Sequence, residues 1–170
     1  MKNLLKFGLL AKISNNLESE ILLKLQEIVS LDFRSVKKRL LVDFPHYTHP
    51  ELDEMEVEVK RFLALALLEK DAGHRIVVSE KIDTLWHYFI LHTSVYRKFC
   101  QSVYGAYLNH VPILPEEKKS LGPDYQKTRR LYAVYFGEPP VHLWGDNQQI
   151  CWGGCDERVE NPQLEEMIEK

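Results

Sequence analysis

A helix start signal at Thr48-His49-Pro50-Glu51 constrains the fold of this 170-residue chain most strongly. Thr48 can cap a helix, Pro50 suits a first helical turn, and Glu51 stands three residues after Thr48, which completes a capping box. The apolar residues that follow recur at helical spacing and are Met55, Val59, Phe62, Leu63, Ala66 and Leu67. We therefore predict a long amphipathic helix from Thr48 to about Glu69, with Gly73 as its stop.

Helical periodicity extends over most of the remaining chain. Two apolar stripes between residues 17 and 42 predict two helices with a break near residues 30–32. Residues 75–78 read as an extended linker, and Ser79 as the N-cap of a helix that begins at Glu80. Thr93 starts another helix that ends at Gly105, and residues 123–136 form a last one before Pro139-Pro140. Residues 141–155 contain three glycines and show no clear period, so they are predicted as a loop.

These elements predict an all-α fold, a single-domain bundle of about five to six helices with a Gly/Cys/Trp-rich C-terminal loop packed on it. The composition agrees, because 45% apolar and 11% aromatic residues suffice for a buried core and exclude a disordered chain. We expect one domain over residues 1–155, with its motif core at about 75–115. An acidic C-terminal tail at 156–170 follows.

Charge and cysteine content limit the partners and the compartment. The 22 Lys and Arg residues face 25 Asp and Glu residues, so no broad basic surface is expected for nucleic acid. The N-terminal apolar run is broken by Lys6 and ended by Lys12, and no apolar stretch is long enough to cross a membrane. Three cysteines do not make a disulfide framework. The sequence predicts a soluble, cytoplasmic protein whose partner is a protein or a small molecule.

Asp83 and His87 are the first candidate site residues. They stand four residues apart in a predicted helix, so their Cβ atoms lie about 5–6 Å apart on one face. In a metal site, Asp83 would fix which nitrogen of His87 faces the ion. The alternative is a hydrogen-bonded pair with a purely structural role.

Cys151 and Cys155 form a C-x3-C motif with Gly153-Gly154 between them. The glycines let the backbone curl so that both sulfur atoms can face one ion, and zinc suits thiolate ligands best. A single C-x3-C motif also fits two small thiols packed beside Trp144 and Trp152.

His110 and Cys100 complete the candidate ligands. His110 stands where the chain leaves a helix, so it either binds the ion or interacts with the helix C-terminus. Cys100 lies on the apolar helix face four residues after Tyr96, where a core position competes with a ligand role. A Cys-His-Asp combination also permits a nucleophilic thiol, provided that the three groups meet in space.

These residues carry a family resemblance. The pattern D-x-x-W-H, then Y-x-x-x-C, G and H-x-P resembles the glycine-rich domain-containing protein-like family over about residues 75–115. The resemblance implies one structural or functional unit, whose members are Asp83, Trp86, His87, Tyr96, Cys100, Gly105 and His110. Phe89 stands where longer members carry a second histidine, and the long glycine-rich tail is absent, so the chain resembles the short bacterial members. The resemblance implies no particular reaction.

Three functional hypotheses follow. The first is a helical protein of unassigned biochemical role that holds zinc with His87, His110, Cys151 and Cys155, or with Cys100, while Asp83 orients His87. The second is a non-enzymatic protein-interaction module in which Trp86, Trp144 and Trp152 form a binding groove with the tyrosines, and the Asp83–His87 pair is structural. The third is a thiol- or metal-dependent hydrolase-like enzyme, and the sequence leaves open whether the protein is an enzyme at all.

Overall fold

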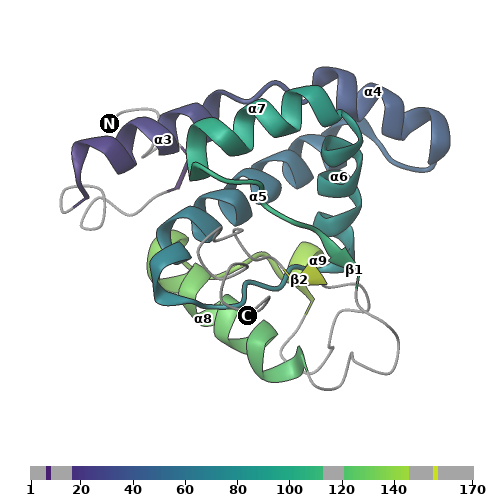
Figure 1. The fold of residues 1–170 in the computed structure, drawn as a ribbon. Helices are drawn as coiled ribbons and strands as arrows, with labels where there is room; N and C mark the ends of the chain where they lie inside the picture. The colour runs from purple at the N-terminus through teal and green to yellow at the C-terminus, as the bar shows by residue number, and fades with distance from the viewer. Residues whose placement is uncertain (1–6, 9–16, 113–120, 146–154, 157–170) are drawn as a thin grey trace, which may run out of the picture.

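The computed structural model describes residues 7–8, 17–112, 121–145 and 155–156 (Figure 1). The described part is all-α, as predicted, and contains seven α-helices, one short 3₁₀ helix and two two-residue strands. The helices are α3 (Ser19–Ser30), α4 (Arg34–Asp43), α5 (His49–Leu68), α6 (Glu80–Leu91), α7 (Thr93–Tyr104), α8 (Gly122–Phe136) and α9 (Val141–Trp144). The 3₁₀ helix η1 is Lys70–Ala72, and the strands are β1 (Val111–Pro112) and β2 (Cys155–Asp156).

Helix α5 is the centre of the bundle. It packs against α3, α6 and α8, and every residue from Phe62 to Leu67 is buried. Figure 1 shows α3, α4 and α7 on one side of α5 and α8 with α9 on the other. The second half of α5 is buried on all faces, because helices pack on it from both sides. It is therefore not amphipathic, although the sequence predicts amphipathicity for the whole helix.

The capping box at the start of α5 is confirmed. The Glu51 backbone N–H donates to Thr48 Oγ1 at 3.4 Å, and the Thr48 backbone N–H donates to the Glu51 carboxylate at 2.8 Å. These bonds satisfy two backbone donors at the helix N-terminus that otherwise have no partner within the helix.

Removing this cap is expected to cost a modest amount of stability. Thr48→Ala removes the side-chain acceptor and should lower the free energy of unfolding by about 1 kcal/mol, measured by urea denaturation. Thr48→Ser keeps the hydroxyl and should unfold within about 0.5 kcal/mol of the unchanged protein. An equal loss in both variants would show that the methyl group of Thr48, and not the cap, matters.

Two other predicted boundaries are confirmed, and a third is corrected. Ser79 caps α6 by accepting from the Ile82 backbone N–H at 3.3 Å. Gly105 ends α7 with a left-handed φ of 77°, a conformation that favours glycine. Helix α5 ends at Leu68 and is followed by η1 before Gly73, so that glycine stops the 3₁₀ turn and not the α-helix itself.

Helix α9 corrects the prediction of a loop from residue 141 onward. The carbonyl groups of its last residues, which have no partner within so short a helix, accept hydrogen bonds from distant side chains. Lys81 donates to the His142 carbonyl at 3.0 Å, and the Ser79 hydroxyl donates to the Leu143 carbonyl at 2.6 Å. The Trp144 carbonyl accepts from the Tyr125 hydroxyl and from Arg129, and Arg129 also donates to the Gly145 carbonyl. We call these contacts the α9 clamp.

A buried polar network, the Glu58 network, joins α5 to α8 and α9. The Glu58 carboxylate accepts from Arg61, from the Tyr132 hydroxyl and from Trp144 Nε1, each at 2.8 Å. Arg61 also donates to the Tyr132 hydroxyl at 2.8 Å. Burial, with the nearby Glu58 charge, raises the pKa of Tyr132, so this phenol stays protonated. Apolar periodicity does not reveal these four side chains as one buried unit.

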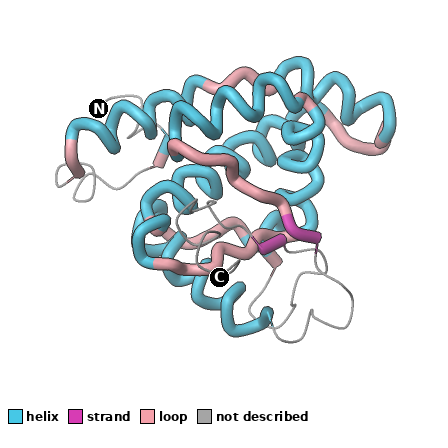
Figure 2. Tube along the Cα trace, viewed as in Figure 1, coloured by secondary structure: helices cyan, strands magenta, loops and turns pink. Residues whose placement is uncertain are grey.

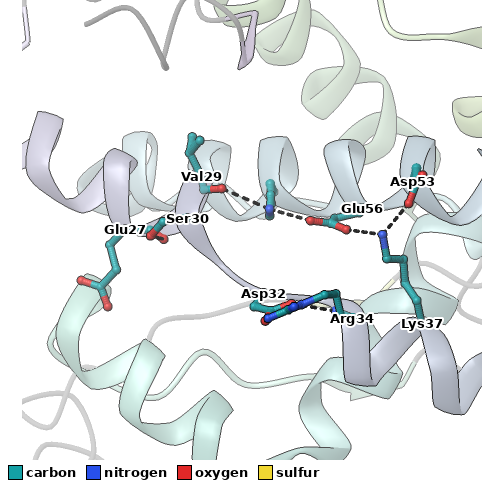
Figure 3. A network of polar contacts seen from close by, with 9 residues as sticks. Glu27, Val29, Ser30, Asp32, Arg34, Lys37, Asp53 and Glu56 are labelled. Atoms are coloured by element: carbon teal, nitrogen blue, oxygen red, sulfur yellow. Dashed lines mark hydrogen bonds and ion pairs between the residues drawn. The ribbon is translucent and has the colours of Figure 1, made fainter.

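A second set of charges lies where α3, α4 and α5 meet (Figure 3). Lys37 on α4 pairs with Asp53 at 2.5 Å and with Glu56 at 2.6 Å, both on α5. Glu56 also pairs with Lys60 at 2.6 Å, and Lys60 donates to the Val29 carbonyl at the end of α3. The network fixes how the chain turns between α3 and α4, because it ties both helices to α5.

Strands β1 and β2 form an antiparallel pair with Val111 opposite Asp156 and Pro112 opposite Cys155 (Figure 2). The predicted boundary between domain and tail, after residue 155, therefore falls inside β2. The rest of the predicted acidic tail, residues 157–170, lies outside the described residues. Of the helices in the described ranges, none is long and apolar enough to cross a membrane.

Candidate functional site

The candidate site is built from α6 and from the segment that follows α7. Asp83 and His87 lie on α6, four residues apart, and the left-handed turn at Gly105 lets the chain run back past α6 to His110. The Asp83 and His110 side chains are 18% and 12% exposed, and His87 is exposed. His87 therefore lies at the surface, whereas the Asp83 and His110 side chains are mostly covered and only partly reached by solvent.

One ring nitrogen of His110 is the centre of this arrangement. Its Nε2 lies 3.1 Å from Asp83 Oδ1 and 3.5 Å from His87 Nδ1. The spacing along α6 assigns Asp83 to His87, whereas the structure pairs the Asp83 carboxylate with His110. Sequence spacing identifies only neighbours on the same helix. The segment that follows α7 returns past α6 and brings His110 close to both Asp83 and His87.

The Trp86 ring packs against the His110 ring and fixes its orientation. The two rings stack with their centroids 4.7 Å apart and their planes 29° from parallel. Trp86 is fully buried and also packs edge-on against Phe62 of α5 at 5.1 Å. Because the indole belongs to the core, the imidazole plane is set by the core packing and not by solvent.

Burial excludes two of the three tryptophans from the predicted aromatic groove. Trp86 and Trp144 are both fully buried, so neither can line a surface groove. Trp152 lies outside the described residues. The sequence pattern that favoured a groove, large aromatic side chains at helical spacing, is the same pattern that a helical core produces.

Tyr96 and Cys100 support the site from α7. The Tyr96 hydroxyl donates to the Leu108 carbonyl at 2.8 Å, which holds the segment before His110 against the helix. Cys100 is fully buried, and this burial raises the pKa of its thiol. A reactive thiol needs the opposite shift and access to solvent, so Cys100 is a core residue rather than a nucleophile.

Of the two remaining cysteines, the structure describes only the backbone of one. Cys151 lies outside the described residues, and Cys155 is described by its backbone alone. That backbone pairs with Pro112, two residues after His110. The pairing, which periodicity cannot reveal in strands of two residues, places the backbone of Cys155 beside the strand that begins directly after His110.

Within the described ranges, no group of three or more His, Cys, Asp or Glu side chains is placed to hold a metal ion. The alternative of Cys100 as a ligand beside His87 and His110 is therefore not supported by the arrangement. A complete metal site at His87 and His110 needs ligands from outside these ranges.

Comparisons with known proteins place the chain in a family. The searches of curated proteins and of solved structures found no match. The predicted resemblance to the glycine-rich domain-containing protein-like family is not indicated by the comparisons and stays a prediction. A family model described as UCP032817-like matches residues 24–133, which include Asp83, His87, Cys100 and His110 but end before Cys151. Because this match covers more than half of the chain, the protein belongs to the UCP032817-like family.

Proposed function

We propose that the protein binds one zinc ion, with His87 and His110 as nitrogen ligands and Cys151 and Cys155 as thiolate ligands. The observation that carries this proposal is the 3.5 Å distance between His87 Nδ1 and His110 Nε2. Two nitrogen ligands that each lie about 2.0–2.1 Å from a tetrahedral zinc ion are about 3.3–3.4 Å apart. The two histidines thus have the separation of neighbouring ligands on such an ion.

The strand pairing supports the thiolate half of the proposed site. Adjacent strands lie about 4.8 Å apart, so the backbone of Cys155 runs beside the strand that begins directly after His110. Cys151 is four residues before Cys155, with two glycines between them. Two imidazoles and two thiolates make a closed Cys2His2 set, which is typical of structural zinc sites.

Asp83 gives the proposed site a zinc-free state, in which its carboxylate is hydrogen-bonded to His110. Asp83 Oδ1 lies 3.1 Å from His110 Nε2, the nitrogen that would bind zinc. A nitrogen bound to zinc carries no proton, so the ion and the Asp83–His110 hydrogen bond compete for it. Asp83 therefore holds the His110 ring in place without zinc, and leaves a negative charge beside the ion when zinc is bound.

A closed site favours a structural role over hydrolysis. With four protein ligands no position is open for water, so the ion would stabilise the fold rather than activate a nucleophile. Zinc would tie the C-terminal segment to the α6 and α7 side of the bundle, in addition to the β1–β2 pairing. The function proposed is zinc-dependent stabilisation of this surface.

Elemental analysis of untagged protein, purified without chelator, tests the proposal. We expect about one zinc ion per chain, and loss of the metal in His87→Ala, His110→Ala and Cys151→Ser, because each variant removes a ligand. His142→Ala is the matched histidine control, since His142 also pairs with a carboxylate, Glu54, at 2.9 Å. Cys100→Ser is the matched cysteine control. Both controls should keep the metal.

Thermal unfolding with and without chelator provides the second readout. A ligand that binds only the folded state raises its stability, so chelator should lower the Tm of the unchanged protein and leave that of His87→Ala unmoved. Metal-free protein, or zinc retained in both histidine variants, would contradict the proposal. Circular dichroism confirms that each variant is folded before its metal content is read.

A further inference from the structure

Phe7 packs on the helix bundle although it lies well before α3 in the chain. Its side chain is 7% exposed, and its ring meets Phe136 of α8 edge-on, with the centroids 5.6 Å apart and the planes at 79°. The Arg61 guanidinium of α5 lies over the same ring, with Cζ 5.8 Å from the centroid. Two helices therefore hold one side chain of the N-terminal segment. We call Arg61, Tyr132 and Phe136 the Arg61 site.

Arg61 also binds the backbone of this segment. Its Nε and Nη2 donate to the Phe7 carbonyl at 3.0 Å and 2.9 Å, so both hydrogen bonds reach one oxygen atom. Its Nη1 donates to the Glu58 carboxylate and to the Tyr132 hydroxyl, each at 2.8 Å. Because the guanidinium is planar and rigid, these two partners also fix the nitrogen atoms that face Phe7. The donors for a peptide carbonyl are thus held in place by residues of the bundle itself.

Gly8 is the second residue that the Arg61 site selects. Its φ is 98°, in the left-handed region that favours glycine. A Cβ atom added at this position would lie 2.5 Å from Arg61 Nη2, the atom that donates to the Phe7 carbonyl. A larger residue would therefore push Arg61 away from that carbonyl and would also strain the backbone. The contact selects an aromatic residue followed by glycine.

The contact of this segment with the bundle is small. Within the described ranges it consists of one buried ring and one carbonyl group, and segments near a chain end open at lower cost than the core. Arg61 is 20% exposed, so water can replace the carbonyl while Glu58 and Tyr132 keep their hydrogen bonds to Nη1. The Arg61 site therefore stays formed when the segment leaves.

We propose that Phe7 and Gly8 form a reversible latch on the Arg61 site, and that opening of the latch uncovers a binding site for a Phe-Gly peptide segment. In the closed state the chain's own segment occupies the site. In the open state Phe136 offers an aromatic contact, and Arg61 offers two donors to a carbonyl and excludes a Cβ atom on the next residue. The latch does not depend on the proposed zinc site, because none of its residues is a ligand there.

Fluorescence anisotropy of a labelled peptide with the sequence of residues 2–12 tests the site on the full-length protein. Gly8→Ala opens the latch without changing a residue of the Arg61 site. It should bind the peptide at least about tenfold more tightly than the unchanged protein, whose own segment competes at a high effective concentration. Phe7→Ala opens the latch by a second route and should also bind the peptide. Circular dichroism confirms that both variants are folded.

Peptides that carry Phe7→Ala or Gly8→Ala are the matched controls. The first lacks the ring, and the second carries the Cβ atom that the site excludes, so each should bind the Gly8→Ala protein at least about tenfold more weakly than the unchanged peptide. Equal binding of all three peptides would overturn the proposal. So would equal binding of the unchanged peptide to the unchanged protein and to Gly8→Ala, or no binding to either variant at millimolar peptide.

Hydrogen exchange of the Arg61 Nε–H group, followed by NMR, measures whether the closed latch opens. This proton is hydrogen-bonded to the Phe7 carbonyl. A reversible latch opens without global unfolding, so the protection factor of this proton should be at least about tenfold below that of the Leu63 amide in the core of α5. Gly8→Ala should lower the protection further, and the peptide should restore it. Protection equal to that of Leu63 would show that the segment is a permanent part of the fold, and would overturn the latch.

Discussion

Glu58→Ala is expected to lower the free energy of unfolding by about 3–5 kcal/mol, among the largest effects of any single substitution here. Glu58 is 3% exposed, and its carboxylate accepts from Arg61, Tyr132 and Trp144. The alanine removes the acceptor for all three donors at once and leaves the Arg61 charge without its nearest carboxylate. Breaking one side of a buried ion pair costs more than the pair contributes to stability.

Urea denaturation followed by circular dichroism measures this loss. Glu54→Ala is the matched control, because Glu54 lies on the same helix, also pairs with a partner on α9, and is 60% exposed. An exposed pair contributes about 0–1 kcal/mol, so the control should be nearly neutral. If Glu58→Ala were as mild as Glu54→Ala, the Glu58 network would not stabilise the fold.

Trp144→Ala is expected to cost about 3–5 kcal/mol, as large-to-small changes at buried tryptophans do. Trp144 is fully buried, packs on Tyr125 and Tyr132, and donates its indole N–H to Glu58. The packing loss and the lost donor can be separated by comparison with Trp86, whose buried indole N–H has no hydrogen-bond partner in the described residues.

The comparison uses phenylalanine at both positions. Trp144→Phe and Trp86→Phe remove the same atoms from fully buried side chains, but only the first takes a donor away from Glu58. Trp144→Phe should therefore cost about 1–3 kcal/mol more than Trp86→Phe in the same denaturation experiment. Equal losses would mean that volume alone determines the cost and that the Trp144–Glu58 hydrogen bond adds nothing.

The helices could be predicted because their signals are local. The capping box at Thr48, the N-cap at Ser79 and the left-handed glycine at Gly105 each act within one helical turn, and all three boundaries are confirmed. The predicted break near residues 30–32 also separates α3 from α4. Short-range hydrogen bonds and backbone sterics depend on residues that are close in the sequence. Apolar periodicity and capping residues therefore suffice to predict these helices.

The parts that could not be predicted depend on residues far apart in the chain. Helix α9 is one turn long and is held by Ser79, Lys81, Tyr125 and Arg129, none of which lies near it in the sequence. Glu58 is acidic and interrupts the apolar pattern of α5, and its partners Tyr132 and Trp144 come from other helices. No local pattern encodes such contacts.

The candidate site contains features that could be predicted from the sequence and others that could not. Asp83 and His87 could be placed on one helix face from their spacing, and Cys100 could be weighed as a core residue from its apolar neighbours. That His110 meets both Asp83 and His87 depends on how the chain returns from α7, which spacing does not contain. The pairing of Pro112 with Cys155 is equally non-local.

The α9 clamp and the β1–β2 pairing hold the chain at two points on either side of residues 146–154. Arg129 holds the Gly145 carbonyl at one end of the segment that contains Cys151, and the pairing of Cys155 with Pro112 holds the other end. Fixing a point of the chain lowers its conformational entropy, and this loss is part of the free energy of folding. For the zinc site proposed above, the entropy of placing the Cys155 backbone beside the strand that follows His110 is therefore lost on folding rather than on metal binding.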